Sequence, residues 1–308
     1  MRIARGFTGL LFAAALGAST TGCIKKMMLD GQIKGTRDGS AAVNTLQDYE
    51  IANQIAFAGI GQMEGMHRLA PNNLDALFML TRSWSSVSYA FIEDQYEQYY
   101  EKGDDVLATY HLMRARAAYQ RAIYYGLELL SHTADGFEQA RRNQDTMRKW
   151  LTDNFTDKED AENLLWTGYA WVGNVGASKD VPEVVGDLYV GVELVKRSVE
   201  LDDTAGNGMG HIVLGAYYAA MKEFDKSKAE LDRANQINDG KFLSVQLNLA
   251  TRYYCAKSDK ENYVKTLEEI LAAGDTMPSA RLPNTIAKRR ARRYLGSKVW
   301  QEECGFTL

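Results

Sequence analysis

The sequence predicts an all-α fold of irregular helical hairpins, and three observations lead to it. Prolines are rare in this chain of 308 residues, and each lies where helical periodicity starts or stops: Pro71, Pro182, Pro278 and Pro283. Proline inside a helix removes a hydrogen bond and clashes with the preceding turn, so such a chain can be helical almost throughout. No sustained alternation of apolar and polar residues indicates a strand. The third observation is a repeated pattern of helix pairs.

The chain begins with the pattern of an export signal that ends at a cysteine. Two arginines precede the apolar run Phe7–Gly17, and a small-residue segment follows the run and ends at Cys23. The run is too short to span a bilayer, which takes about 20 apolar residues. We expect residues 1–22 to be a lipoprotein signal peptide and Cys23 to be the site of lipid attachment. The alternative is an exported protein without a lipid, because Thr20 stands where such sites usually carry an aliphatic residue.

Residues 23–45 are rich in small and polar side chains, and we expect a flexible tether between the lipid anchor and the body. The remaining residues, 46–308, are long enough for one large domain or one elongated repeat domain. Their apolar side chains recur at helical spacing. The sequence therefore predicts a signal peptide, a tether and one helical domain.

Helical periodicity predicts the elements of this domain in order. It places helices over residues 45–69, 74–100, 104–130, 137–151, a span that includes 164–171, and 182–201. Pro71 ends the first helix, and Asn73 caps the second. In a capping box, two side chains satisfy the free backbone N–H groups at a helix start. This spacing occurs at Thr156 with Glu159 and at Asp180 with Glu183.

The clearest repeat unit extends from His211 to Asn238. It has the residue order of a tetratricopeptide repeat, at Leu214, Gly215, Tyr218, Phe224, Leu231 and Ala234. Gly215 and Ala234 are small because the two helices of such a hairpin approach closely there. Weaker pairs precede and follow this unit at uneven spacing. We therefore expect an irregular tetratricopeptide-like domain of about four hairpins, whose stacking gives a curved surface suited to binding.

Composition and motifs exclude several function classes. The net charge is −4, so no basic field attracts nucleic acid. No later apolar segment is long enough to span a membrane. The histidines lie far apart and have no metal-ligand spacing with cysteine or glutamate. No nucleophile motif occurs. We therefore expect a protein that is not an enzyme and needs no cofactor or metal.

Two small groups of residues remain candidates for a structural or binding role. Cys255 and Cys304 either pair as a disulfide in an oxidising compartment or remain two separate thiols, because sequence does not give their distance. Trp166, Tyr169 and Trp171 either pack in the core at helical spacing or line an apolar pocket.

The strongest charge feature is a basic run near the C-terminus. It consists of Lys288, Arg289, Arg290, Arg292 and Arg293. Such a run is either a solvated helix face whose aliphatic stems cover apolar surface, or a docking patch for an acidic partner or for anionic lipid headgroups.

Several short segments together resemble a known family. They are Asn73–Leu77, Leu80–Arg82, Leu165–Thr167 with Trp171, Ser178–Asp180, Leu214–Tyr218, Leu282–Asn284 and Ala287–Ala291. In order and spacing, over roughly residues 46–300, they resemble the TatT components of TRAP transporters. TatT components are tetratricopeptide-repeat lipoproteins associated with that transport system. The resemblance implies a periplasmic body that works beside a solute-binding protein and a permease. It also implies a homo-oligomer, such as a trimer with pores, and a hydrophobic or carboxylate ligand.

We therefore predict a non-enzymatic lipoprotein accessory to TRAP-type solute uptake. It would bind the periplasmic solute-binding protein and a small organic or hydrophobic ligand. The alternative is a tetratricopeptide scaffold lipoprotein that organises cell-envelope assembly machinery. The residue after the lipidated cysteine is Ile24 and not the aspartate that favours inner-membrane retention in some bacteria. We expect an outer-membrane anchor with the body in the periplasm.

Overall fold

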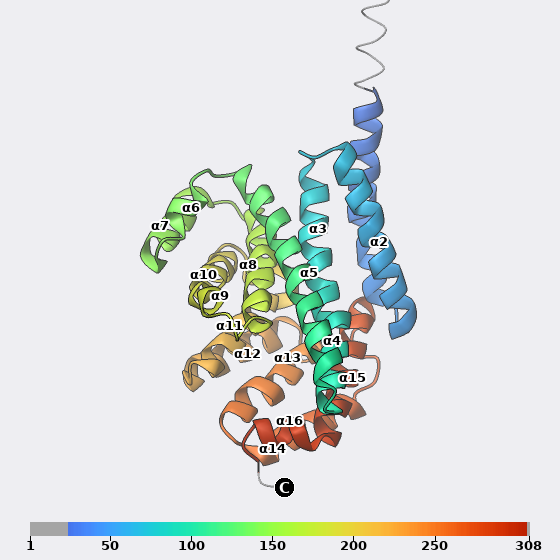
Figure 1. The fold of residues 1–308 in the computed structure, drawn as a ribbon, viewed down its shortest axis with the longest axis vertical. Coiled ribbons are helices and arrows are strands. Elements are labelled where there is room, and N and C mark those ends of the chain that lie inside the picture. Colours follow the sequence, from blue (N-terminus) through green and yellow to red (C-terminus); the bar gives the residue numbers. More distant parts are fainter. Residues whose placement is uncertain (1–23, 307–308) are drawn as a thin grey trace, which may run out of the picture.

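The computed structural model describes residues 24–306, and every regular element in that range is helical. The prediction of an all-α fold is therefore confirmed. Helices α3, α5 and α8 lie side by side through the middle of the molecule (Figure 1). The N-terminal helix and α2 flank them on one side, and α6 and α7 lie on the other. The helices from α12 onward gather at the end opposite the chain's start (Figure 1).

The helices have the following bounds. They are α2 (Tyr49–Leu69), α3 (Leu74–Val87), α4 (Glu93–Glu101), α5 (Asp105–Ser131), α6 (Phe137–Ala140), α7 (Gln144–Asn154), α8 (Asp160–Gly176), α9 (Pro182–Gly186), α10 (Leu188–Leu201), α11 (Ala205–Ala220), α12 (Phe224–Ile237), α13 (Leu243–Asn248), α14 (Lys260–Ala272), α15 (Arg281–Gly296) and α16 (Lys298–Glu303). Two 3-10 helices, η1 (Ser40–Thr45) and η4 (Pro278–Ala280), and two π-helices, η2 (Ser88–Ile92) and η3 (Leu249–Tyr254), complete the set.

Side-chain caps fix many of the helix starts. A carboxylate or amide oxygen accepts a hydrogen bond from a backbone N–H of the first turn, which has no partner within its helix. Asn73 acts in this way on Ala76, as its sequence position predicts. The other residues that cap in this manner are Asp48, Asp104, Asn143 and Asp259.

The two predicted capping boxes are wrong. Helix α8 begins after Glu159, whose side chain makes no capping bond. Asp180 pairs instead with Arg116 of α5. The helix predicted over residues 182–201 is also interrupted at Asp187, between α9 and α10. At this interruption the carbonyl oxygen of Asp187 accepts a bond from Trp171 Nε1 of α8 at 3.1 Å.

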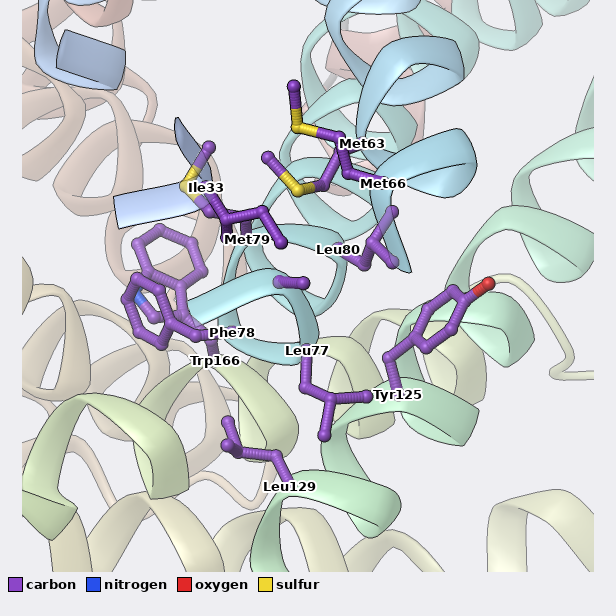
Figure 2. Close-up of a cluster of buried hydrophobic side chains, with 11 residues drawn as sticks. Ile33, Met63, Met66, Leu77, Phe78, Met79, Leu80, Tyr125, Leu129 and Trp166 are labelled. Carbon is purple, nitrogen blue, oxygen red and sulfur yellow. The ribbon is translucent and has the colours of Figure 1, made fainter. Parts of the chain in front are cut away.

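The segment expected to be a flexible tether is largely helical. Residues 24–39 form a helix, which we call the N-terminal helix. Ile33 is fully buried among methionines and α3 side chains (Figure 2). Arg37 pairs with Asp75 at 2.6 Å, which fastens the helix to the start of α3. The structure thus differs from the expected flexibility, while the link to a lipid anchor stays a prediction, since residues 1–23 lie outside the described range.

The predicted repeat unit forms the hairpin of α11 and α12. A Cβ atom built on Gly215 would lie 2.6 Å from Cγ of Leu231, so only glycine allows this approach. Ser227 Oγ donates to the Gly215 carbonyl at 2.8 Å across the same contact. Ala234 is fully buried in this region. The close packing expected from the sequence is therefore present.

The beginning and the end of the domain meet. Helix α15 packs against α2 and η1, and Tyr100 at the end of α4 donates to Glu303 of α16 at 2.7 Å. Cys255 and Cys304 are joined by a disulfide, which resolves the open alternative from the sequence. None of the helices in the described range is long and apolar enough to cross a membrane.

Candidate functional site

The three aromatic residues singled out in the sequence do not share one site. Trp166 and Tyr169 lie three residues apart on α8, and their ring centroids are 5.6 Å apart. Trp171 points into another core, where its ring contacts Phe137 at 5.8 Å. Only Trp166 and Tyr169 can therefore line the same pocket, and Trp171 is a core residue.

Trp166 and Tyr169 belong to a row of three aromatic rings with a guanidinium group at each end. Arg82 of α3 lies over Trp166 at 5.3 Å, and Tyr169 meets Tyr89 of η2 edge-on at 6.4 Å. Arg290 of α15 lies over Tyr89 at 4.0 Å. A cation over an aromatic face is attracted by the ring's negative quadrupole. Together with two neighbouring charges, these residues form what we call the inner cluster: Arg82, Tyr89, Glu93, Trp166, Tyr169, Arg252 and Arg290.

Arg290 is the charged centre of the inner cluster. Its side chain is 2% exposed, and it donates to the Tyr89 carbonyl at 2.6 Å. Burial opposes its charge, but the nearby carboxylate of Glu97, 3.2 Å away, raises the pKa of Arg290 well above its usual value. The guanidinium is thus held permanently charged, although its Nε has no hydrogen-bond partner in the described part of the chain.

Glu93 supplies the opposite charge at the same place. Burial raises the pKa of its carboxyl, and Arg290 acts in the other direction. Tyr119 donates to Glu93 at 2.7 Å, which orients the carboxylate. The exposed Arg252 of η3 acts on Glu93 and on Tyr169 through its charge, so it belongs to this group although it lies far along the chain.

The Arg82 end of the cluster has unused hydrogen-bonding capacity. Trp166 is 8% exposed, and its buried Nε1 has no partner within residues 24–306. Arg82 has no ion pair within that range, and burial lowers its pKa. A buried donor without a partner is costly, and native proteins rarely leave one in place without a reason. This end of the cluster can therefore accept an anionic or carbonyl oxygen.

Two π-helical segments contribute to the inner cluster. Tyr89 lies on η2 and Arg252 on η3, which are far apart in sequence. Single π-helical turns are rare and occur often at functional sites, since the extra residue changes which side chains face inward. The sequence did not group Arg82, Tyr89, Glu93 and Arg252, because their proximity depends on how distant helices pack.

The sequence left open whether the basic run on α15 is a solvated face or a docking patch, and most of its side chains are instead paired within the fold. Two of its side chains turn toward α4, where Arg289 pairs with Asp94 at 2.9 Å and Arg293 pairs with Asp94 and Glu97. Burial opposes the ionisation of Asp94, but Arg293 and Arg289 lower its pKa. We call this contact the α4–α15 clasp.

Two further members of the run are also held within the fold. Lys288 donates to the backbone carbonyls of Ala273 and Gly274, and Arg290 belongs to the inner cluster. Within the run only Arg292 is exposed. This charged helix face is largely shielded from solvent because Asp94 and Glu97 of α4 pair with its arginines.

An exposed apolar stripe lies elsewhere, on α5. Val106, Tyr110 and Met113 are 80%, 56% and 61% exposed. Their spacing of four and three residues puts them on one helix face. The N-terminal end of α5 lies toward α16, at the opposite end of the molecule from the N-terminal helix (Figure 1). We call these residues the α5 stripe.

No group of three or more histidine, cysteine, aspartate or glutamate side chains in the described part of the chain could hold a metal ion.

A family model described as TRAP transporter T-component matches residues 45–299. A search of curated proteins gives no match.

Proposed function

Since the chain belongs to the TRAP transporter T-component family, whose members are transport accessory proteins, we propose two binding roles for it. The first is binding of a small organic ligand at the inner cluster. The second is binding of the periplasmic solute-binding protein of the transporter. In both roles the protein acts without catalysis. The inner cluster supports the first role, and the α5 stripe supports the second.

The chemistry of the inner cluster favours an organic carboxylate with an apolar part. A guanidinium binds a carboxylate through two parallel hydrogen bonds, which are stronger than neutral ones. Arg82 has no acidic partner within 4 Å in the described chain, and the indole N–H of Trp166 has no acceptor. The faces of Trp166 and Tyr169 would cover the apolar part. This proposal rests on one observation: Arg82 lies over the Trp166 ring, and both side chains have hydrogen-bond donors without a partner in the described chain.

Titration with a series of small carboxylates tests the ligand proposal. Tryptophan fluorescence reports binding, because Trp166 lies at the site. We expect Arg82→Gln to weaken binding about tenfold or more, since a hydrogen bond to a charged group contributes about 1.5–3 kcal/mol. Arg142→Gln is the matched control, because Arg142 is exposed and lies outside the cluster. Equal affinities of the two variants would contradict the proposal.

The α5 stripe is the surface we propose for the solute-binding protein. Exposed Tyr and Met residues are enriched at protein interfaces. The stripe lies at the end away from the N-terminal helix, so a body anchored through Cys23 would present it to the periplasm. A charged residue there should abolish capture of the partner.

The test of this surface is crosslinking and co-purification of the solute-binding protein with Val106→Asp/Met113→Asp. The control is Met221→Asp, at a residue that is 47% exposed at the end of α11. We expect the control to capture the partner as the wild type does, and the double variant to lose it. If the double variant instead keeps the partner and has a lower native mass, the stripe joins copies of this chain and the proposal is wrong.

We also propose that acylated Cys23 holds the protein on the outer membrane with its body in the periplasm. The export pattern before Cys23 and the family's role in transport support this location. Metabolic labelling with a fatty acid should mark the wild type and not Cys23→Ala. Membrane fractionation of the labelled protein then distinguishes the outer from the inner membrane.

A further inference from the structure

The N-terminal helix extends beyond the body of the protein. Its contacts with the body begin at Leu29, which packs against the core that contains α3, and at Asp30, which accepts a bond from Asn73 Nδ2 at 2.8 Å. They continue through Ile33 and Arg37. The first turn has no such support, and the helix stands past the ends of α2 and α3 (Figure 1). The helix is thus fixed to the body, and its start projects from it.

The projecting turn exposes apolar side chains. Ile24, Met27 and Met28 are 51%, 68% and 68% exposed, and their spacing of three and four residues keeps them close together. Exposed methionines next to an exposed isoleucine are unusual for a surface that faces only water. The free turn therefore has the character of a contact surface.

The loop between α2 and α3 adds to this surface. Leu69 is 74% exposed and Leu74 is 48% exposed, on either side of the loop that ends at Asn73. Since Asn73 bonds to Asp30, both leucines lie near the base of the projecting turn. This end of the molecule thus exposes apolar side chains both on the projecting turn and on the α2–α3 loop at its base.

Cations accompany these apolar side chains. Lys25 and Lys26 are exposed on the free turn, and Arg68 is exposed beside Leu69. Asp30 pairs with Lys26 at 2.8 Å, and Asp75 beside Leu74 is neutralised by Arg37. An excess of positive charge remains, which complements the phosphate groups of anionic lipids.

We propose that this end of the protein docks on an anionic bilayer surface. Ile24, Met27 and Met28 enter the interface between headgroups and acyl chains, and Leu69 and Leu74 rest at the headgroup level. From Asp30 to Ile24 the helix rises about 9 Å, which matches the roughly 5–10 Å depth that interfacial helices reach. The inference rests on the proposed acylation of Cys23, directly before Ile24. A rigid helix in place of a flexible tether then holds the body at a set angle to the membrane.

The test measures the depth of single positions on vesicles. The full-length acylated chain is reconstituted into vesicles of phosphatidylcholine and phosphatidylglycerol. An environment-sensitive fluorophore is placed on Met28→Cys and, as the matched control, on Met113→Cys of the distant α5 stripe. The native cysteines do not react, because Cys255 and Cys304 form a disulfide and Cys23 carries the lipid. Brominated lipids then quench a fluorophore that lies in the bilayer interface.

We expect brominated lipids to quench the label at position 28 about threefold more than the label at position 113. Lys25→Glu/Lys26→Glu should reduce that quenching on anionic vesicles, and added salt should have the same effect. Equal, weak quenching at both positions in a chain that floats with the vesicles would overturn the docking and leave the lipid anchor intact. A label at position 28 shielded from both lipid and aqueous quenchers would indicate a protein partner there and also overturn it. A chain that does not float would refute the anchor and the docking together.

Discussion

Glu64 is the residue whose replacement should change the pH dependence of stability most clearly. It lies on α2 and accepts hydrogen bonds from Trp84 Nε1 at 2.8 Å and from Tyr125 at 2.5 Å. Arg121 donates to both carboxylate oxygens, at 3.0 and 2.6 Å. One carboxylate thus joins α2 to α3 and α5. Burial opposes its ionisation, but the bonds from Arg121, Tyr125 and Trp84 lower its pKa from 4.5 to about 2.

The magnitude follows from the difference in pKa between the folded and unfolded chain. A decrease from 4.5 to about 2 corresponds to roughly 3 kcal/mol of stability, taken as an upper value because the side chain is 23% exposed. Because the folded pKa is the lower one, this stability is fully present above about pH 4.5. It is lost as the pH falls toward 2, where the folded protein must also take up the proton.

Urea unfolding of the wild type and Glu64→Gln at several pH values is the assay. We expect the variant to be about 2–3 kcal/mol less stable at pH 7, with the difference shrinking as the pH falls from 4.5 to 2. Glu50→Gln on the exposed face of the same helix is the control and should match the wild type. A difference between wild type and Glu64→Gln that stays constant over this pH range would refute the electrostatic argument.

Three further perturbations test the packing and the closures of the fold. Gly215→Ala should lower the free energy of unfolding in urea by about 1–3 kcal/mol, because the new methyl group overlaps Leu231. Adding Leu231→Ala to this variant should remove the overlap, and an unchanged stability of the single variant would contradict the close approach. Asp94→Asn should lower the free energy of unfolding by up to about 3 kcal/mol, because it removes one of the two carboxylates that pair with the buried Arg293 and also the partner of Arg289. A thermal melt like that of the wild type would show that the α4–α15 clasp is not needed. Reduction of the Cys255–Cys304 disulfide should lower the free energy of unfolding by about 2–4 kcal/mol, seen as a lower urea midpoint with dithiothreitol. As the control, the Cys255→Ala/Cys304→Ala variant should have the same midpoint with and without reductant.

Only the two aromatic residues of α8 in the candidate ligand site followed from local sequence pattern. The spacing of Trp166 and Tyr169 on one helix was visible because helical periodicity is a property of neighbouring residues. The same pattern also suggested Trp171, which the tertiary structure turns into a separate core. Arg82, Glu93 and the other members of the inner cluster come from helices distant in sequence, so no local pattern groups them.

The sequence by itself determined the helical class, the close α11–α12 hairpin at Gly215 and the family to which the chain belongs. The first two depend on proline placement and apolar spacing, which act over a few turns of chain, and the family follows from the order of short motifs along the chain. The pairing of Cys255 with Cys304 was left open, because their distance depends on the whole fold.

Only the tertiary structure decided where charge and order lie. The basic run of α15 has the composition of a solvated face, but the acidic residues of α4 hold it inside the fold. Residues 24–39 have the composition of a flexible segment, but Ile33 and Arg37 find partners on α2 and α3 that make a helix stable there. In both cases the free energy comes from side chains far away in sequence, and it outweighs the local preference of the segment itself.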